Sequence, residues 1–227
     1  MSESDMFPFM REWLSDMDVS LAENLRSWAE NELIAKRLEH KEDYEMLLLP
    51  AIKKLFLDIG LQRLLWPEDY GGDGHNIPAA AYTMTAGLEQ IARGDTGIAL
   101  LLSGIWALQS GVAMDHSMNK EVCEVLSTVF SEKKVPAVVS MVLPLYRGTP
   151  QATAKNSKDS WTVEAKNTRP AASGSDAALY GVLCSLGDSE DEVGFIVVPA
   201  NTKGVKQGKP FLKTGLAADR NADVTFA

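Results

Sequence analysis

The sequence predicts an α+β protein in which an all-α helical bundle is followed by a small antiparallel β-barrel or sheet domain. Up to about residue 134, apolar side chains recur every three or four residues, the spacing of amphipathic helices. Beyond it, short β-branched and aromatic runs alternate between clusters of Gly, Pro, Asn and Asp. The charge balance also changes there, from 12 basic and 22 acidic residues in 1–140 to 10 and 9 in 141–227. We therefore expect two domains, 1–134 and 135–227.

Five segments of the first part carry the helical pattern: residues 20–38, 45–60, 77–93, 96–114 and 119–133. Ser20 and Glu23 have the spacing of a capping box, which predicts the start of the first helix. Gly60 stands where a glycine commonly ends a helix, and Gly94 follows the third helical pattern directly.

The segment 96–114 holds no charged residue and is just long enough to be tested as a membrane span. Gly97, Ser103 and Gln109 interrupt it, and no basic residue flanks it to set an orientation. A helix buried inside a bundle explains the segment better, so no membrane span is expected.

The second part is predicted to form short strands. The expected strands are 135–143, 160–168, 177–186, 192–200 and 223–227. The strands before and after the acidic tip at Asp188–Glu192 are expected to form a hairpin. Trp161 occupies an alternating position of its strand that is typical of a side chain in the core of a barrel. There is no βαβ alternation, so a Rossmann domain is not expected.

Composition excludes several classes of function. A net charge of −9 and an isoelectric point near 4.9 argue against nucleic acid and anionic membranes as partners. Cys123 and Cys184 are isolated, which is typical of reduced thiols in a cytoplasmic protein. Metal binding is not expected, because the histidines lie far apart in the sequence, at His40, His75 and His116. Spacing alone gives no catalytic constellation.

One stretch of the sequence carries a specific motif. The segment IGLQRLLWPEDYGGDG, residues 59–74, is followed by a helix that ends GLEQIARGD. This order closely resembles the acyl-CoA dehydrogenase family, in which a helix ends in Gly-Leu and leads through Pro-Glu-x-Tyr-Gly-Gly-x-Gly. The matching residues are Gly60, Leu61, Pro67, Glu68, Tyr70, Gly71, Gly72, Gly74, Glu89, Ile91, Ala92 and Asp95. The later segments VGFIVVPANTKGV and LKTGLAADRNADVTF also resemble strands of that family.

The resemblance implies a flavoprotein that binds FAD and an acyl-CoA thioester. In the family, two segments of the β-domain hold the flavin ring. Their positions here are Met141, Val142 and Leu143, and then Ala171, Ala172 and Ser173. The acyl substrate is expected at Gly94, Ile98, Leu101, Gly148 and Thr149. For these residues a central helix and a surface turn are the alternative interpretations.

The sequence departs from the family at the flavin segments. Val142 and Ala172 stand where the family has hydroxyl side chains, and Pro170 stands where it has an aromatic ring. The family's catalytic glutamate aligns beyond Ala227, so no catalytic residue is assigned in this chain. We therefore expect weak or absent FAD binding by the chain alone.

Two classes of function remain. The first is an oxidoreductase of lipid metabolism that desaturates an acyl-CoA and passes electrons to a flavin electron acceptor, with this chain inactive alone. The second is a non-catalytic family member that acts as a partner subunit or binds acyl-CoA. The eroded flavin segments favour the second class and the family base rate favours the first, and we expect the first for the parent protein, with this chain inactive alone. A homo- or hetero-oligomer is expected in either case.

Overall fold

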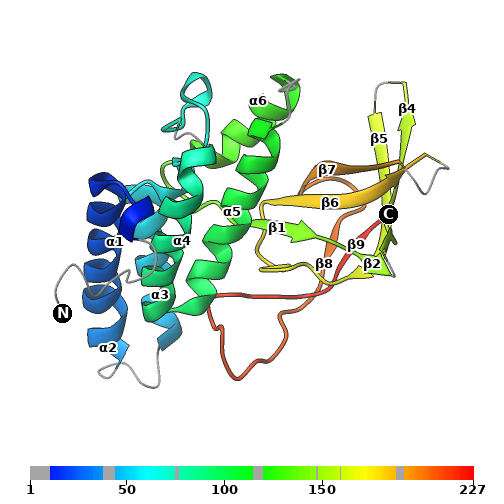
Figure 1. The fold of residues 1–227 in the computed structure, drawn as a ribbon. Coiled ribbons are helices and arrows are strands. Elements are labelled where there is room, and N and C mark those ends of the chain that lie inside the picture. The colour runs from blue at the N-terminus through cyan, green and yellow to red at the C-terminus, as the bar shows by residue number, and fades with distance from the viewer. Residues whose placement is uncertain are drawn as a thin grey trace.

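The computed structural model describes residues 11–37, 44–74, 77–114, 120–146, 148–158, 160–187 and 192–227. Helices fill the first part and strands the second, as the sequence predicts (Figure 1). The helical elements are η2 (Arg11–Trp13), α1 (Asp16–Ala29), η3 (Glu30–Ile34), α2 (Ala35–Arg37), α3 (Tyr44–Lys53), η4 (Lys54–Asp58), η5 (Leu61–Arg63), η6 (Glu68–Tyr70), α4 (Ile77–Gly94), α5 (Thr96–Met114) and α6 (Lys120–Phe130).

The first helix begins earlier than the sequence predicts. Ser15 caps α1, because its hydroxyl accepts a hydrogen bond from the Asp18 amide while the Asp18 carboxylate accepts one from the Ser15 amide. This capping box replaces the predicted one, and Ser20 lies inside α1. Ser15 and Asp18 have the same spacing as Ser20 and Glu23 and likewise pair a serine with an acidic residue, so the local pattern did not distinguish the two starts.

The turn between η4 and α4 forms around Trp66. Its indole Nε1 donates to the Tyr70 carbonyl and the Ser127 hydroxyl, both at 3.1 Å. Gly60 and Gly71 adopt left-handed backbone angles, φ 89° and φ 82°. A Cβ at Gly72 would lie 1.9 Å from the Trp66 carbonyl oxygen, so only glycine fits there.

The uncharged helix α5 is the centre of the helical core. Ile98, Leu102, Ile105 and Trp106 are fully buried. Their burial confirms the interpretation of this segment as an internal helix. Within the described residues, no helix combines the length and the apolar character that crossing a membrane requires.

The strands are β1 (Val139–Val142), β2 (Leu145–Tyr146), β3 (Thr149–Pro150), β4 (Thr153–Ser157), β5 (Ser160–Thr168), β6 (Leu179–Leu186), β7 (Val193–Pro199), β8 (Lys206–Gln207) and β9 (Val224–Phe226). The order in the main sheet is β1-β6-β4-β5-β9-β8, and β7 pairs with the other edge of β6. The predicted hairpin is confirmed, because β6 and β7 pair antiparallel from Leu179–Pro199 to Ser185–Val193. Residues 188–191 of its acidic tip lie outside the described residues.

The sheet is mixed, so the prediction of a purely antiparallel sheet is wrong. β1 pairs parallel with the first half of β6, and β4 pairs parallel with its end. Both strands therefore share one edge of β6. The strands curl into a half-barrel beside the helices (Figure 1). Pairings between strands 30 to 40 residues apart depend on the whole fold, and local alternation does not encode their direction.

Helices and sheet share one apolar core. Val139, Ala172, Leu179 and Ala218 belong to the same buried cluster as the residues of α5. Gln62 ties the connecting segment to the helices, because its side chain donates to the carbonyls of Phe130 and Glu132 and accepts from the Ala137 amide. The domain boundary at 134/135 remains a prediction, since this core crosses it.

Candidate flavin and acyl site

The structure brings together the two segments that the sequence predicts to hold a cofactor. The Ala171 amide donates to the Met141 carbonyl at 2.8 Å. Next to this pair, the hydroxyl of Ser140, which precedes Met141, donates to the carbonyl of Ala172, which follows Ala171. The end of β1 and the loop after β5 therefore lie side by side, although about 30 residues separate them in the sequence.

Most side chains of these segments face the core. Val142 is fully buried in the sheet core, and Ala172 is buried in the core shared with the helices. Met141 packs against the same shared core. Leu143 and Ala171 are exposed, and Met141 is only partly buried and lines the groove of about 1150 Å³ between helices and sheet, so these three side chains are left to meet a ligand.

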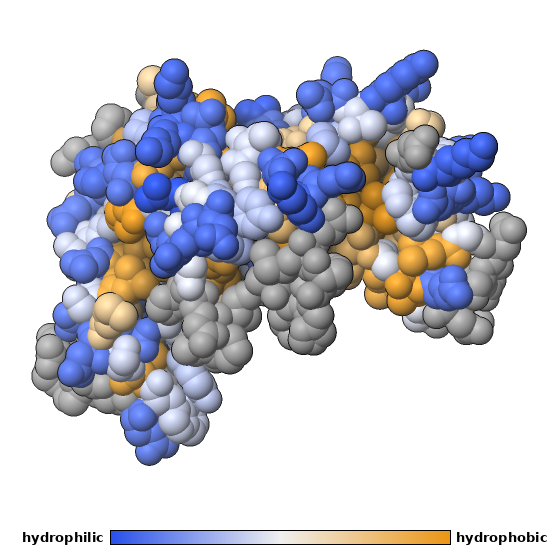
Figure 2. Space-filling view, turned by 90° about the horizontal axis from the view of Figure 1, so that it is seen from above, coloured by the Kyte–Doolittle hydropathy of each residue, from blue (hydrophilic) through white to orange (hydrophobic). Residues whose placement is uncertain are grey.

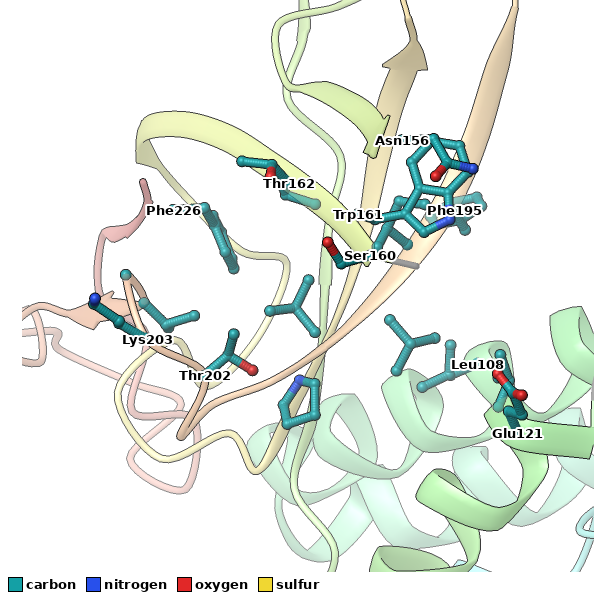
Figure 3. Close-up of a pocket in the computed structure, with 18 of the residues that line it drawn as sticks. Leu108, Glu121, Asn156, Ser160, Trp161, Thr162, Phe195, Thr202, Lys203 and Phe226 are labelled. Atoms are coloured by element: carbon teal, nitrogen blue, oxygen red, sulfur yellow. The ribbon is translucent and has the colours of Figure 1, made fainter. Parts of the chain in front are cut away.

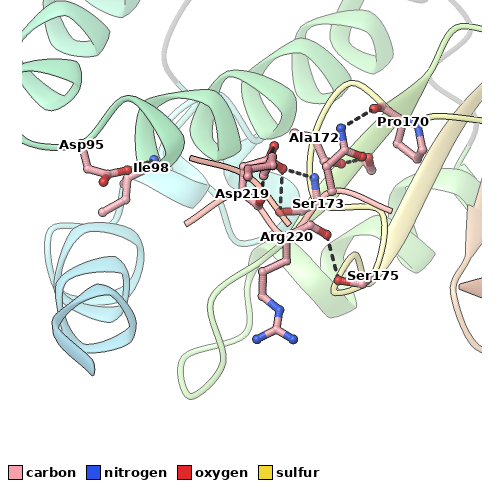
Figure 4. A network of polar contacts seen from close by, with 11 residues as sticks. Asp95, Ile98, Pro170, Ala172, Ser173, Ser175, Asp219 and Arg220 are labelled. Carbon is pink, nitrogen blue, oxygen red and sulfur yellow. Dashed lines mark hydrogen bonds and ion pairs between the residues drawn. The ribbon is translucent and has the colours of Figure 1, made fainter. Parts of the chain in front are cut away.

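Ser173 is held by a buried carboxylate (Figure 4). Its backbone has φ 43°, a left-handed conformation that is uncommon for a residue with a side chain. The Asp219 carboxylate accepts the Ser173 amide at 2.5 Å, and the Lys213 ammonium donates to its other oxygen at 2.7 Å. Asp219 is only 3% exposed, so this pair links the loop 213–219 firmly to the second predicted flavin segment.

The predicted acyl residues at the start of α5 belong to the helical core. Ile98 and Leu101 are buried there, and a Cβ at Gly94 would lie 2.9 Å from Leu33 and 3.0 Å from Ala29. Asp95 caps α5, because its carboxylate accepts the Ile98 amide at 3.0 Å. A crevice of about 520 Å³ lies between residues 92–97, Arg37 and residues 214–217; Gly94 lines it, whereas Ile98 and Leu101 do not.

The other two predicted substrate residues lie in a separate hairpin. Gly148 precedes β3 and Thr149 begins it, and within the described residues β3 pairs with β2 in a two-stranded sheet. Gly148 has φ 89° and open space around it. The structure does not bring this pair into the crevice beside Gly94, and its contact with an acyl substrate remains a prediction.

The residues present do not fit FAD well. The two buried side chains at 142 and 172 carry no hydroxyl, and Pro170 offers no aromatic ring. Backbone amides can also donate, but those of Ala171 and Ser173 already bond to Met141 and Asp219, and the Ser173 hydroxyl lies 3.5 Å from the Asp219 carboxylate. A flavin ring needs donors for its carbonyl oxygens and ring nitrogens, and the chain uses these amides for its own packing.

Other ionisable clusters are scarce. Among the described residues, no group of three His, Cys, Asp or Glu side chains could hold a metal ion, and all three histidines lie outside that part of the chain. Burial raises the pKa of the Cys184 thiol to about 11, so this cysteine is a poor nucleophile.

Sequence reasoning missed a groove between the helices and the sheet (Figure 3). It encloses about 1150 Å³ and is lined by the end of α5, the start of α6, β5, β7 and the chain end at Phe226 and Ala227. Trp161 lines it and is 46% exposed, so the prediction of a core tryptophan is wrong. The half-barrel is open on this side, and Figure 2 shows apolar surface exposed on the sheet half of the molecule.

Comparison with known proteins supports the resemblance. Residues 15–121 match the family described as acyl-CoA dehydrogenase, N-terminal domain. The resemblance drawn from the sequence is thereby confirmed: the helical part matches that family's N-terminal domain, and the fold of the chain is that of acyl-CoA dehydrogenases.

The individual relatives share only a small part of their sequence with this chain, with identities of 26%, 19% and 14%. Cyclohexane-1-carbonyl-CoA dehydrogenase of Syntrophus aciditrophicus is 26% identical over 183 residues, which are 78% of this chain and 46% of the relative. Butyryl-CoA dehydrogenase from Megasphaera elsdenii has the same fold, with a TM-score of 0.70, 19% identity and 94% of this chain covered. An acyl-CoA dehydrogenase complexed with FAD from Bacillus anthracis has the same fold as well, with a TM-score of 0.68, 14% identity and 96% of this chain covered.

The match covers only part of each relative. This chain spans 46% of the Syntrophus protein, 56% of the Megasphaera protein and 36% of the Bacillus protein.

Proposed function

We propose that this chain is a non-catalytic, acyl-CoA dehydrogenase-like unit that is inactive on its own and does not retain FAD. One observation carries the proposal: the amides of Ala171 and Ser173 are already bonded within the chain. The side chains at 142 and 172 are buried and apolar, so they add no donor. Losing several hydrogen bonds of about 1 kcal/mol each weakens binding by two or more orders of magnitude.

The role that follows is that of a partner subunit or an acyl-CoA binding protein within a homo- or hetero-oligomer. The shared core between helices and sheet supports a stable scaffold for such a role. The crevice beside Gly94 is the place in this chain where an acyl-CoA thioester would be sought first. A cytoplasmic location, expected from the two buried free cysteines, remains part of this proposal.

The second candidate is the family's own activity in the whole protein. It would be an FAD-dependent oxidoreductase that desaturates the α,β bond of an acyl-CoA and passes electrons to a flavin acceptor. The family match over 15–121 favours it. In that case the catalytic glutamate and the missing flavin contacts come from polypeptide outside these 227 residues.

A visible spectrum tests the first proposal on the chain itself. The 227-residue chain is purified without and with added FAD, and absorbance near the flavin bands is measured after gel filtration. The Bacillus anthracis dehydrogenase, seen complexed with FAD, serves as the positive control. We expect a colourless chain that reduces no electron acceptor with butyryl-CoA. Stoichiometric flavin in the chain would reject the proposal and favour the dehydrogenase.

A further inference from the structure

We propose that part of the loop between β8 and β9 is a strained closure beside the crevice at Gly94, which opens as a unit and, through Asp219, sets the conformation of Ser173. The moving part is the strap, residues 213–219. The loop leaves the sheet after β8, reaches the start of α5 and returns to β9 (Figure 1). The coupling of the strap to a ligand rests on the acyl-CoA site proposed above, whereas the strap itself rests on its own contacts.

Asp219 holds two backbone angles that residues with a side chain rarely adopt. Among the described residues, the non-glycine residues with a left-handed φ are Lys158, Ser173 and Leu216. Two of them meet at Asp219. The Ser173 amide, at φ 43°, donates to the Asp219 carboxylate, and the Asp219 amide donates to the carbonyl of Leu216, at φ 56°. Such angles store strain that the surrounding contacts must hold, so strain gathers on both sides of one buried residue.

The local sequence does not force the strain at Leu216. Gly215, one residue earlier, could take a left-handed angle without steric cost, yet the angle falls on the leucine. Leu216 is 39% exposed, so burial of its side chain offsets the strain only in part. A strained conformation persists where other contacts over-determine it. An open strap with a relaxed Leu216 therefore competes with the closed one.

The contacts that hold the strap closed centre on one ion pair. The Lys213 ammonium donates to the Asp219 carboxylate at 2.7 Å and also to the Asp219 carbonyl, which joins the two ends of the strap. Behind it, a Cβ added at Gly97 of α5 would lie 3.1 Å from Ala218 and 3.3 Å from the Asp219 amide, so the strap packs closely on the helix. Residues 213–217 are exposed, so the strap can move without unpacking the core.

The strap lies between two predicted sites. Residues 214–217 form one wall of the crevice of about 520 Å³, and residues 92–97 with Arg37 form the other. On its other side, Asp219 holds Ser173 of the second predicted flavin segment (Figure 4). A ligand in the crevice that contacts the closed strap would stabilise it, and the Ser173 conformation with it.

Amide hydrogen exchange, measured by NMR on the full chain, tests the strap. The Ser173 and Asp219 amides report on it, because both of their hydrogen bonds break when the strap opens. We expect both amides to exchange through the same opening, and faster than the amides of the β6–β7 ladder. Leu216→Gly should slow both about fivefold, because glycine takes the left-handed angle without the steric cost that leucine has. The matched control is Leu212→Gly, at a fully exposed leucine without a left-handed angle, which should not slow them.

A second pair of variants tests the ion pair. Lys213→Met removes the ammonium and keeps most of the side chain, so it should speed exchange of the Ser173 amide about tenfold, although the lysine bonds to Asp219. Lys209→Met, at an exposed lysine just before the strap, should leave that exchange unchanged. Thermal melts confirm that all variants fold.

Butyryl-CoA separates the strap from the ligand site. Bound in the crevice, it should slow exchange of both reporter amides in the parent chain. No effect of butyryl-CoA together with the expected effect of Leu216→Gly would reject the acyl site in the crevice and support the strap. Unequal opening of the two reporter amides, or no slowing by Leu216→Gly, would overturn the strap.

Discussion

The turn 60–74 and the paired segments 141–143 and 170–173, which the sequence predicts to be the family's turn and flavin segments, differ in the residues that they retain. The turn keeps the family residues, and each has a packing reason: Gly71 takes φ 82° and Gly72 has no room for a Cβ. The paired segments keep their backbone contact, the Ala171–Met141 hydrogen bond, without the family's polar side chains. The turn therefore has the residues that stabilise the fold, whereas the paired segments lack the side chains that would bind the flavin.

The largest expected effect tests the turn. Gly72→Ala would place a methyl group 1.9 Å from the Trp66 carbonyl oxygen, so the backbone must move. We expect a loss of about 3 kcal/mol or more in the free energy of unfolding, measured by urea denaturation. Gly111→Ala is the control, since nothing lies within 4 Å of its Cβ position in α5. The control should stabilise the helix by about 0.5–1 kcal/mol. Similar results for both variants would contradict the packing account of the turn.

The second prediction tests the link that holds the second flavin segment. Asp219→Ala leaves the Ser173 amide and the Lys213 ammonium without their carboxylate. We expect a loss of about 2–3 kcal/mol, because Asp219 is buried while Lys213 is 26% exposed. The comparison is Asp223→Ala, whose 3.5 Å pair with Arg169 is exposed on both sides. That variant should change stability by less than about 1 kcal/mol.

A third prediction asks whether Val142 is a core residue or a degenerate cofactor residue. Val142→Thr keeps the shape but buries a hydroxyl in the sheet core, so we expect a loss of about 1–2 kcal/mol and no gain in FAD binding. Val193→Thr, at a 53% exposed position, should be neutral. A stable Val142→Thr variant that binds FAD would show that this side chain faces the ligand after all.

The same contrast explains how much the sequence predicts. Helix periodicity and the glycine at 60 are local signals, and they predict α3 to α6 and the turn with few errors. The parallel pairing of β1 with β6 and the exposure of Trp161 depend on strands far apart in the sequence, so alternation alone predicts them wrongly. The Asp219–Ser173 contact is likewise non-local, since it spans 46 residues.

The smallest expected effect lies in the helical part, where a charge cluster joins the two π-helical turns. The hydrogen bonds from Lys36 and Lys54 lower the pKa of Glu32 below its ordinary value of 4.5. A carboxyl whose pKa falls on folding stabilises the protein above its unfolded pKa and loses that contribution as the pH falls through the folded value. Glu32→Gln should therefore lower stability by about 0.5–1 kcal/mol at pH 7. The difference from the parent chain should shrink progressively below pH 4.5 in denaturation curves.

Glu124→Gln is the matched control for that measurement. Its pair with Lys120 spans 3.7 Å and is 79% and 59% exposed, so the solvent screens it almost fully. It should leave stability within about 0.5 kcal/mol of the parent chain. Raising the salt concentration should reduce the Glu32→Gln effect as well, because both lysines remain partly exposed. An effect of Glu32→Gln that persists unchanged at pH 3 would show that Glu32 acts through packing, and the charge cluster would then contribute nothing to the helical core.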